Sequence, residues 1–265
     1  MKKGLALFNL VSVLILIAVN SLSQIYRWND TTIGEMSQQY DNLFTPAGYA
    51  FSIWGLIFLS LLGFALFCVR RSFFSDKDSE FIGQTGASVG MASLLASAWV
   101  IAFIYGYLLL SLALMLGILF YLLRGVIRLN MERWDAPIEI LAFVWWPISF
   151  FSGWISVATI ANFSVFLVKM DLTGSTLTQI VWTMVMITIA VFLNILMINL
   201  RNMREFAMVG AWALIAIFIR HQGNYNAIAY YALAGAVILL IAAGIHGYKN
   251  RDTNPFNKLK QRLNQ

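Results

Sequence analysis

The sequence predicts an all-α membrane protein, a polytopic bundle of about eight transmembrane helices. Hydrophobic residues make up 60% of the 265 positions and charged residues only 11%, far below the roughly 25% charged residues of an average soluble domain. Apolar stretches of about 20 residues recur, which is the length that spans a bilayer as a helix. These stretches cover residues 5–22, 48–69, 83–105, 107–124, 138–168, 180–199, 206–219 and 227–248.

The basic residues between these stretches predict the topology. With eight crossings, all of the 18 Lys and Arg residues except Arg27, Lys169 and Arg220 fall on one face. Because basic loops stay in the cytoplasm, both termini are expected there. The short stretch 206–219 must cross for the basic tail to obey the same rule. Short loops and the lack of an Arg/Ser-rich transit segment favour a bacterial inner (plasma) membrane.

The first stretch has a second interpretation. Lys2 and Lys3 precede it, and the small residues Ser21 and Ser23 follow it, which is also typical of a signal peptide. Cleavage would leave seven helices. The sequence leaves both interpretations open.

Composition also argues against several function classes. The net charge of +6 is explained by loop anchors beside an anionic leaflet, so no nucleic-acid partner is expected. One cysteine and two distant histidines predict no metal site and no required cofactor. Ionisable residues are missing from the middle of the apolar runs, which disfavours proton relays and ion-coupled transport. No hydrolase or phosphate-binding motif occurs, so we expect no enzyme activity.

The loop after the first stretch, residues 23–47, is unusually aromatic. Such a loop can fold over a pocket as a lid, or its aromatic rings can sit at the lipid headgroups as an interfacial belt. Both remain open. Its aromatic and acidic residues are Tyr26, Trp28, Tyr40, Phe44, Asp30, Glu35 and Asp41.

The fifth stretch carries a stripe of three residues spaced by four: Trp154, Ala158 and Asn162. Residues at this spacing share one helical face. A flat indole, a gap and an amide would suit a large planar or amphipathic ligand. They would equally suit helix packing, with Ala158 allowing close approach and Asn162 bonding to a neighbouring helix. The residues alone leave both possibilities open.

The run from Trp154 to Asn162 resembles the Trp-x-x-x-Ala-x-x-x-Asn stripe of the translocator protein family, also called TspO/MBR or tryptophan-rich sensory proteins. Pro46 and Trp54 fall in register with that family's motif at the start of its second helix. Trp99 has a looser likeness in the third. The resemblance covers about residues 5–168, whereas Gly48 stands where the family usually has tryptophan.

This resemblance implies a sensory or regulatory protein that binds a flat hydrophobic ligand, such as a porphyrin or sterol-like molecule, in an intramembrane pocket. Trp54 and Trp154 would flank the ligand, Asn162 would supply a polar contact, and Ala158 would leave room. The other implied site residues are Tyr49, Phe51, Trp99 and Pro46. A transporter or exporter of an amphipathic solute, and a structural assembly protein, are the alternatives.

Three parts of the chain follow from this interpretation. Residues 1–168 would form a five-helix core, 169–248 a three-helix extension and 249–265 a basic cytoplasmic tail. The extension is expected to pack on the core and could cover the surface that five-helix relatives use to dimerise, leaving a monomer. The expected partners are the lipid bilayer and a small hydrophobic ligand.

Overall fold

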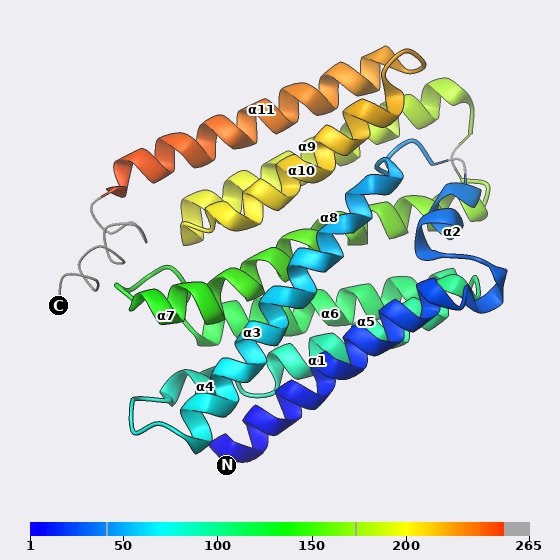
Figure 1. Ribbon diagram of the computed structural model, residues 1–265. Coiled ribbons are helices and arrows are strands. Elements are labelled where there is room, and N and C mark those ends of the chain that lie inside the picture. The colour runs from blue at the N-terminus through cyan, green and yellow to red at the C-terminus, as the bar shows by residue number, and fades with distance from the viewer. Residues whose placement is uncertain (41, 173, 252–265) are drawn as a thin grey trace.

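A computed structural model describes residues 1–40, 42–172 and 174–251, and this part of the chain is helical. Asp41 and the tail beyond Arg251 lie outside the described residues. Figure 1 shows a layered bundle of long helices. The elements are α1 (Lys2–Ile25), η1 (Trp28–Asp30), α2 (Ile33–Gln39), η2 (Gly48–Ser52), α3 (Ile53–Phe73), α4 (Glu80–Thr85), α5 (Ser88–Ile104), α6 (Leu108–Arg128), α7 (Ile138–Ile140), η3 (Leu141–Trp145), α8 (Trp146–Lys169), α9 (Thr176–Arg201), α10 (Arg204–His221) and α11 (Asn226–Lys249).

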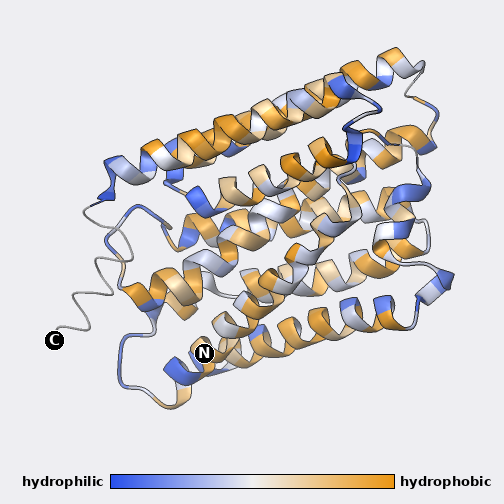
Figure 2. Ribbon diagram, turned by 45° about the horizontal axis from the view of Figure 1, so that its top comes forward, coloured by the Kyte–Doolittle hydropathy of each residue, from blue (hydrophilic) through white to orange (hydrophobic). Residues whose placement is uncertain are grey.

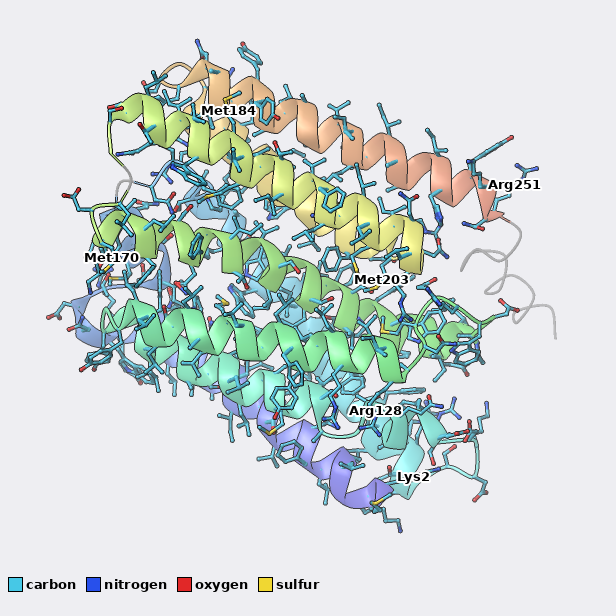
Figure 3. All side chains as sticks on the ribbon, turned by 180° about the vertical axis from the view of Figure 1, so that it is seen from behind. Lys2, Arg128, Met170, Met184, Met203 and Arg251 are labelled. Carbon is cyan, nitrogen blue, oxygen red and sulfur yellow. The ribbon has the colours of Figure 1, made fainter. Side chains whose placement is uncertain are left out.

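The long helices run back and forth between two ends of the bundle. Figure 3 places Lys2, Arg128, Met203 and Arg251 at one end and Met170 at the other. The described part of the chain therefore starts and finishes at the same end, as an even number of crossings requires. Hydrophilic residues gather towards the two ends, with apolar surface between them (Figure 2).

Six helical segments of the described chain are long and apolar enough to cross a membrane. The helix α5 is shorter, with 17 residues, and α10 carries Arg204, Glu205 and Arg220 near its ends. The protein is thus a multispanning membrane protein by length and composition, whereas eight crossings and cytoplasmic termini stay predictions. The six segments are Lys2–Ile25, Gly48–Phe73, Leu108–Arg128, Ile138–Lys169, Thr176–Arg201 and Asn226–Lys249.

The prediction of a continuous helix over residues 83–105 was wrong, because the helix is broken at Gly86. This glycine has φ +57°, a left-handed conformation that ends α4 and that glycine adopts without steric cost. The side chain of Asn9, fully buried on α1, bridges the break. Its Nδ2 donates to the Gly86 carbonyl at 3.1 Å, and its Oδ1 accepts from the Gly90 N–H at 2.7 Å. The amide thus satisfies backbone groups that the interruption leaves unpaired.

The predicted fifth helix, 138–168, is present in three consecutive pieces. A π-helical turn, Leu141–Trp145, lies between α7 and α8, immediately before Pro147 near the start of α8. Proline has no N–H and cannot donate to the carbonyl four residues earlier, so the hydrogen-bond ladder is interrupted there. A wider turn accommodates this interruption. From Pro147 onward α8 is regular through the Trp154 stripe.

The extension and the core meet mainly through α10 and α8. Within the core, α1 packs on α3 and α5, while α6 packs on α5 and α8; within the extension, α11 packs on α9 and α10. Buried side chains from both parts form one apolar cluster. The extension is therefore packed on the core, as expected, and it covers one side of α8.

The contact between α8 and α10 depends on Gly153. A Cβ atom built there would lie 2.9 Å from the Phe206 carbonyl oxygen and 3.2 Å from its Cα. Because these are backbone atoms, α10 would have to move away. We expect Gly153→Ala to lower the free energy of unfolding by about 1–3 kcal/mol, the usual cost of overpacking. A thermal melt in detergent measures this.

Gly244→Ala is the matched control, because nothing lies within 4 Å of a Cβ at Gly244. Alanine also favours a helix over glycine, so this variant should match or exceed the stability of the parent protein. Equal melting curves for the two variants would contradict the close contact at Gly153.

Candidate ligand-binding cavity

A cavity lies beside α8, towards the end of the bundle that carries α2. Seven of the eight site residues expected from the sequence line it, and they come from distant parts of the chain. The helix α8 supplies the stripe, α3 and the segment before it supply a second wall, and α5 a third. The lining residues are Ile33, Ser37, Pro46, Phe51, Trp54, Trp99, Phe103, Trp154, Val157, Ala158, Ala161, Asn162 and Val165.

The cavity has little free space. Its free volume is about 30 Å³, which leaves room for only one or two water molecules. Sites for drug-sized ligands are roughly ten times larger or more. Any flat ligand must therefore be admitted by movement of the walls.

Five aromatic residues line this space. Phe51 meets Trp154 edge to face, with ring centroids 5.9 Å apart, and Trp99 stacks on Phe103 at 5.1 Å. The Nε1 atoms of Trp54 and Trp99 are buried and have no hydrogen-bond partner among the described residues. A buried donor without a partner costs about 1–3 kcal/mol. Because both nitrogen atoms are buried, an incoming acceptor could satisfy these indole N–H groups only after the cavity walls move.

Asn162 lines the cavity and also bonds to a neighbouring helix. Its Nδ2 donates to Ser111 Oγ on α6 at 3.0 Å, and the Ser111 hydroxyl lies within 3.0 Å of Asn162 Oδ1. Both side chains are buried. The packing role considered for Asn162 is therefore present. A polar contact between Asn162 and a ligand stays a prediction.

Tyr49 does not line this cavity. Its ring meets Trp212 of α10 edge to face at 5.3 Å, and it is 39% exposed. Conversely, the sequence analysis missed Ser111 and the contributions of Ile33 and Ser37. A serine near the start of an apolar helix is too common a signal to single out, and its partner 51 residues away is set only by the packing of α6 on α8.

The sequence was compared with protein families, curated proteins and solved structures. A family model described as TSPO-like protein matches residues 6–245. The chain belongs to the TSPO-like protein family. The resemblance expected from the Trp154 stripe is confirmed, and the match extends beyond residue 168 through α9, α10 and most of α11. Neither the curated proteins nor the solved structures give a match.

The aromatic loop of this TSPO-like protein folds over the cavity. Its short helix α2 begins with a capping box: the Glu35 N–H donates to Thr32 Oγ1, and the Thr32 N–H donates to the Glu35 carboxylate. Ile33 and Ser37 then form part of the cavity wall. Tyr26, by contrast, is 71% exposed, as an interfacial aromatic residue would be. The loop thus covers the cavity through α2, whereas a position of its aromatic rings at the lipid headgroups stays a prediction.

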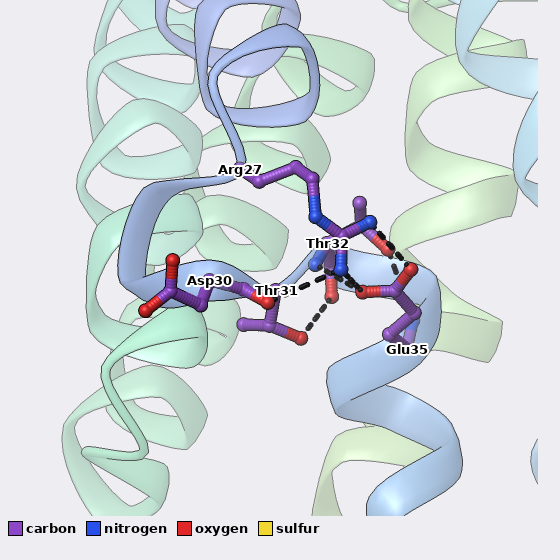
Figure 4. Close-up of polar contacts among 5 residues, drawn as sticks. All are labelled: Arg27, Asp30, Thr31, Thr32 and Glu35. Carbon is purple, nitrogen blue, oxygen red and sulfur yellow. Dashed lines mark hydrogen bonds and ion pairs between the residues drawn. The ribbon is translucent and has the colours of Figure 1, made fainter.

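An ion pair holds the start of this cover (Figure 4). The Arg27 guanidinium donates to both oxygens of Glu35, at 2.8 and 2.9 Å, and to the Asp30 carbonyl at 3.2 Å. The hydrogen bond from Arg27 holds the pKa of Glu35 below its ordinary value. The pair ties the start of the loop after α1 to the first turn of α2.

We expect this tie to weaken in acid. A carboxyl group with a lowered pKa in the folded protein stabilises the fold above its ordinary pKa, and the contribution is lost as the pH falls through the lowered value. The protection of residues 27–39, meaning the slowing of hydrogen exchange relative to the intrinsic rate at the same pH, should therefore decrease below the ordinary glutamate pKa. Glu35→Gln should exchange faster at neutral pH and lose this acid dependence. If hydrogen exchange in Glu35→Gln kept the pH dependence of the parent protein, Glu35 would not be the group whose protonation loosens α2.

The extension of the TSPO-like protein forms hydrogen bonds with the segment that connects α2 to α3. On α10, Arg220 Nη1 donates to the carbonyls of Asn42 and Thr45 at 3.0 and 2.7 Å. The Nε2 of His221 lies 2.7 Å from the Leu43 carbonyl oxygen. We call residues 42–50 the hinge segment.

Two further bonds connect α10 to the hinge segment. Trp212 Nε1 donates to the Ala50 carbonyl at 3.1 Å, and the Ala47 N–H donates to the Ala216 carbonyl at 3.1 Å. Pro46, within the segment, lines the cavity. The extension therefore fixes one wall of the cavity, although none of the extension's described residues line it.

The three basic residues that depart from the charge rule all have structural bonds at this end of the bundle. Arg27 binds Glu35, and Arg220 binds the hinge segment. Lys169 Nζ donates to the Gly106 carbonyl at 3.0 Å, in the turn between α5 and α6. All three cations therefore bond to loops at the end of the bundle that carries the cavity.

Proposed function

We propose that this TSPO-like protein binds a flat hydrophobic ligand, such as a porphyrin or sterol-like molecule, in the cavity beside α8, with a sensory or regulatory role. The observation that carries the proposal is the convergence of seven expected site residues around one cavity. These residues come from α3, α5, α8, η2 and the hinge segment, so chance proximity along the chain does not account for it. The binding chemistry is non-covalent.

The walls favour a planar ligand with a polar rim. Aromatic rings contribute large contact areas, and a few polar groups fix the orientation. Trp54 and Trp154 present such rings, and the unpaired N–H groups of Trp54 and Trp99 can donate to acceptor atoms. A carboxylate, carbonyl or hydroxyl at the edge of the ligand would accept these bonds. A purely aliphatic ligand would leave them unsatisfied.

Binding requires the cavity to open. The hinge segment and α2 are the wall elements outside the long helices, so their displacement is the least disruptive way to enlarge the cavity. Because ligand binding is then coupled to movement of the hinge segment, α10 is the element through which occupancy would be transmitted. This coupling is the basis for the proposed sensory role.

The titration that tests the proposal uses tryptophan fluorescence of the detergent-purified protein with protoporphyrin IX. We expect saturable quenching, and Trp154→Ala should weaken the affinity by roughly tenfold or more through lost aromatic contact, about 1.4 kcal/mol per factor of ten. Trp182→Ala is the control, since Trp182 is 49% exposed on α9. The dissociation constant, rather than the quenching amplitude, is compared because each variant lacks one fluorophore.

Quenching without saturation, or equal affinities for both variants, would contradict binding in this cavity. Flux of the porphyrin across proteoliposomes would distinguish the alternative function, transport of an amphipathic solute. Saturable binding without flux supports the proposed function, whereas flux that depends on Trp154 would favour transport.

A further inference from the structure

A surface cavity of about 390 Å³ lies beside the last turns of α3, and this volume is in the range of ligand sites. Its walls come from α3, the loop between α3 and α4, α7 and η3. Figure 1 shows this loop near the N-terminus, and Lys2 Nζ donates to Ser79 Oγ in the loop at 3.3 Å. This space, which we call the α3 cavity, therefore lies at the end of the bundle opposite α2.

One face of α3 runs along the α3 cavity and changes from apolar to basic. Gly63, Leu66 and Arg70 all line the cavity, and their spacing of three and four residues places them on the same helical face. Leu66 is 52% exposed, within a segment that is apolar and long enough to cross a membrane. Arg70 is exposed in the last turn of the same helix. The stripe rises by about 10 Å, from the apolar span to the level of lipid headgroups.

The apolar part of the α3 cavity is open towards the lipid-facing surface. Opposite Leu66, the wall is formed by Phe143 of η3, which is 43% exposed. Phe143 belongs to a second segment that is long and apolar enough to cross a membrane. Two exposed apolar side chains from two such segments therefore border the cavity, which gives an acyl chain access from the bilayer.

The basic part of the α3 cavity carries accessible cations. Arg70, Arg71 and Lys77 line it together with one carboxylate, that of Glu139. The side chains of Arg70 and Lys77 are exposed, and no hydrogen bond or ion pair joins them to another residue in the described part of the chain. The wall thus has an excess of positive charge, and two of its cations present their donors to the surroundings.

Arg71 is the cation whose position is fixed. Its guanidinium carbon lies 5.0 Å from the centroid of the Phe67 ring, and its Nη1 donates to the Asp78 carbonyl at 3.5 Å. Phe67 in turn stacks on Phe143 with ring centroids 5.3 Å apart. A guanidinium has five N–H donors, so Arg71 keeps donors for a further acceptor. The aromatic wall therefore holds one guanidinium in place beside the two exposed cations.

We propose that the α3 cavity binds an anionic phospholipid. Arg70, Arg71 and Lys77 would donate to the headgroup phosphate, and the start of an acyl chain would lie along Leu66 and Phe143. Guanidinium and ammonium groups are the usual partners of phosphate in proteins. A zwitterionic choline headgroup would bring its own cation towards three cations of the wall. A free phosphate would satisfy the charges but would leave the apolar wall unused, so the geometry favours the lipid.

The test measures binding to the delipidated full-length protein by native mass spectrometry. The probes are phosphatidylglycerol and phosphatidylcholine with the same acyl chains, and soluble glycerophosphoglycerol. We expect phosphatidylglycerol to bind at least about tenfold more tightly than either of the other two. Equal affinity for the two lipids would overturn the proposal. Equally tight binding of glycerophosphoglycerol would show that a free phosphodiester is sufficient, and would overturn the assignment to a lipid.

Charge variants connect this preference to the α3 cavity. Arg70→Gln and Lys77→Gln should each reduce the preference for phosphatidylglycerol by roughly fivefold, the effect of about 1 kcal/mol per cation. Arg124→Gln is the matched control, because Arg124 is exposed on α6 and does not line the cavity. Equal losses in all three variants would mean that the lipid responds to the overall charge of this end, and would overturn the proposal.

Gly63→Leu fills the cavity and leaves every charge in place. A Cβ atom at Gly63 would meet only Phe143, at an ordinary contact distance of 3.5 Å, so a thermal melt should show a folded protein. We expect this variant to lose the preference for phosphatidylglycerol. A folded Gly63→Leu protein with the full preference would show that the lipid binds to surface cations outside the cavity, and would overturn the proposal. If this variant does not fold, the comparison of Arg70→Gln with Arg124→Gln decides.

Discussion

Ala158→Phe is expected to abolish saturable binding of protoporphyrin IX while the helical bundle remains folded. Ala158 lines the cavity beside α8, whose free volume is only about 30 Å³. A benzyl group placed there would occupy the space between Trp154 and Asn162 on the same helical face. We expect a loss of affinity of about 100-fold or more, corresponding to about 2.7 kcal/mol, with overpacking costing roughly 1–3 kcal/mol of stability.

Ala113→Phe is the matched control for this substitution, because Ala113 is exposed on α6. Its affinity for protoporphyrin IX should equal that of the parent protein. Circular dichroism and a thermal melt establish that both variants are folded. If Ala158→Phe binds the porphyrin normally, the ligand does not occupy this cavity. If the variant unfolds, Ala158 serves chiefly as a packing residue, as the alternative interpretation of the stripe holds.

Arg220→Met is expected to loosen the hinge segment and to speed up both association and dissociation of the ligand. The side chain keeps its apolar stem but no longer donates to the carbonyls of Asn42 and Thr45. A hydrogen bond from a charged group contributes about 1.5–3 kcal/mol. Hydrogen exchange of residues 42–50 should therefore accelerate by roughly 10- to 100-fold. Stopped-flow quenching with protoporphyrin IX measures the two rates.

Lys169→Met tests whether this effect is specific to the hinge segment. Lys169 also donates to a backbone carbonyl at the same end, that of Gly106, but it does not contact residues 42–50 through that bond. Exchange of the hinge segment should be unchanged in this variant. Unchanged exchange in Arg220→Met would mean that α10 does not control the cavity wall, and the proposed transmission through the extension would fail.

The architecture was largely predictable because membrane helices can be recognised in a sequence by their length and apolar composition. Each of the eight predicted stretches contains a long helix in the described chain, although a break at Gly86 divides the third and a π-helical turn interrupts the fifth. The break at Gly86 was not predictable, because it depends on Asn9 from another helix supplying both hydrogen bonds. A glycine inside an apolar run is otherwise compatible with a continuous transmembrane helix.

The residues of the candidate site were largely predictable, but the small free volume of the cavity and the pairing of its side chains were not. A spacing of four placed Trp154, Ala158 and Asn162 on one face, and the family resemblance added the residues of α3. No sequence pattern could show that the walls close to about 30 Å³ or that Ser111 pairs with Asn162. Both depend on how α6 packs against α8. The contacts of α10 with the hinge segment join residues about 175 positions apart. They could not be predicted from the sequence either.

The most direct test of the account is an experimental structure of the protein saturated with protoporphyrin IX. We expect the macrocycle beside α8, flanked by Trp54 and Trp154, with the hinge segment and α2 displaced outward and the long helices largely unmoved. Ring substituents should accept hydrogen bonds from the indole N–H groups of Trp54 and Trp99. A porphyrin bound on the lipid-facing surface, with this cavity still closed, would contradict the central claim.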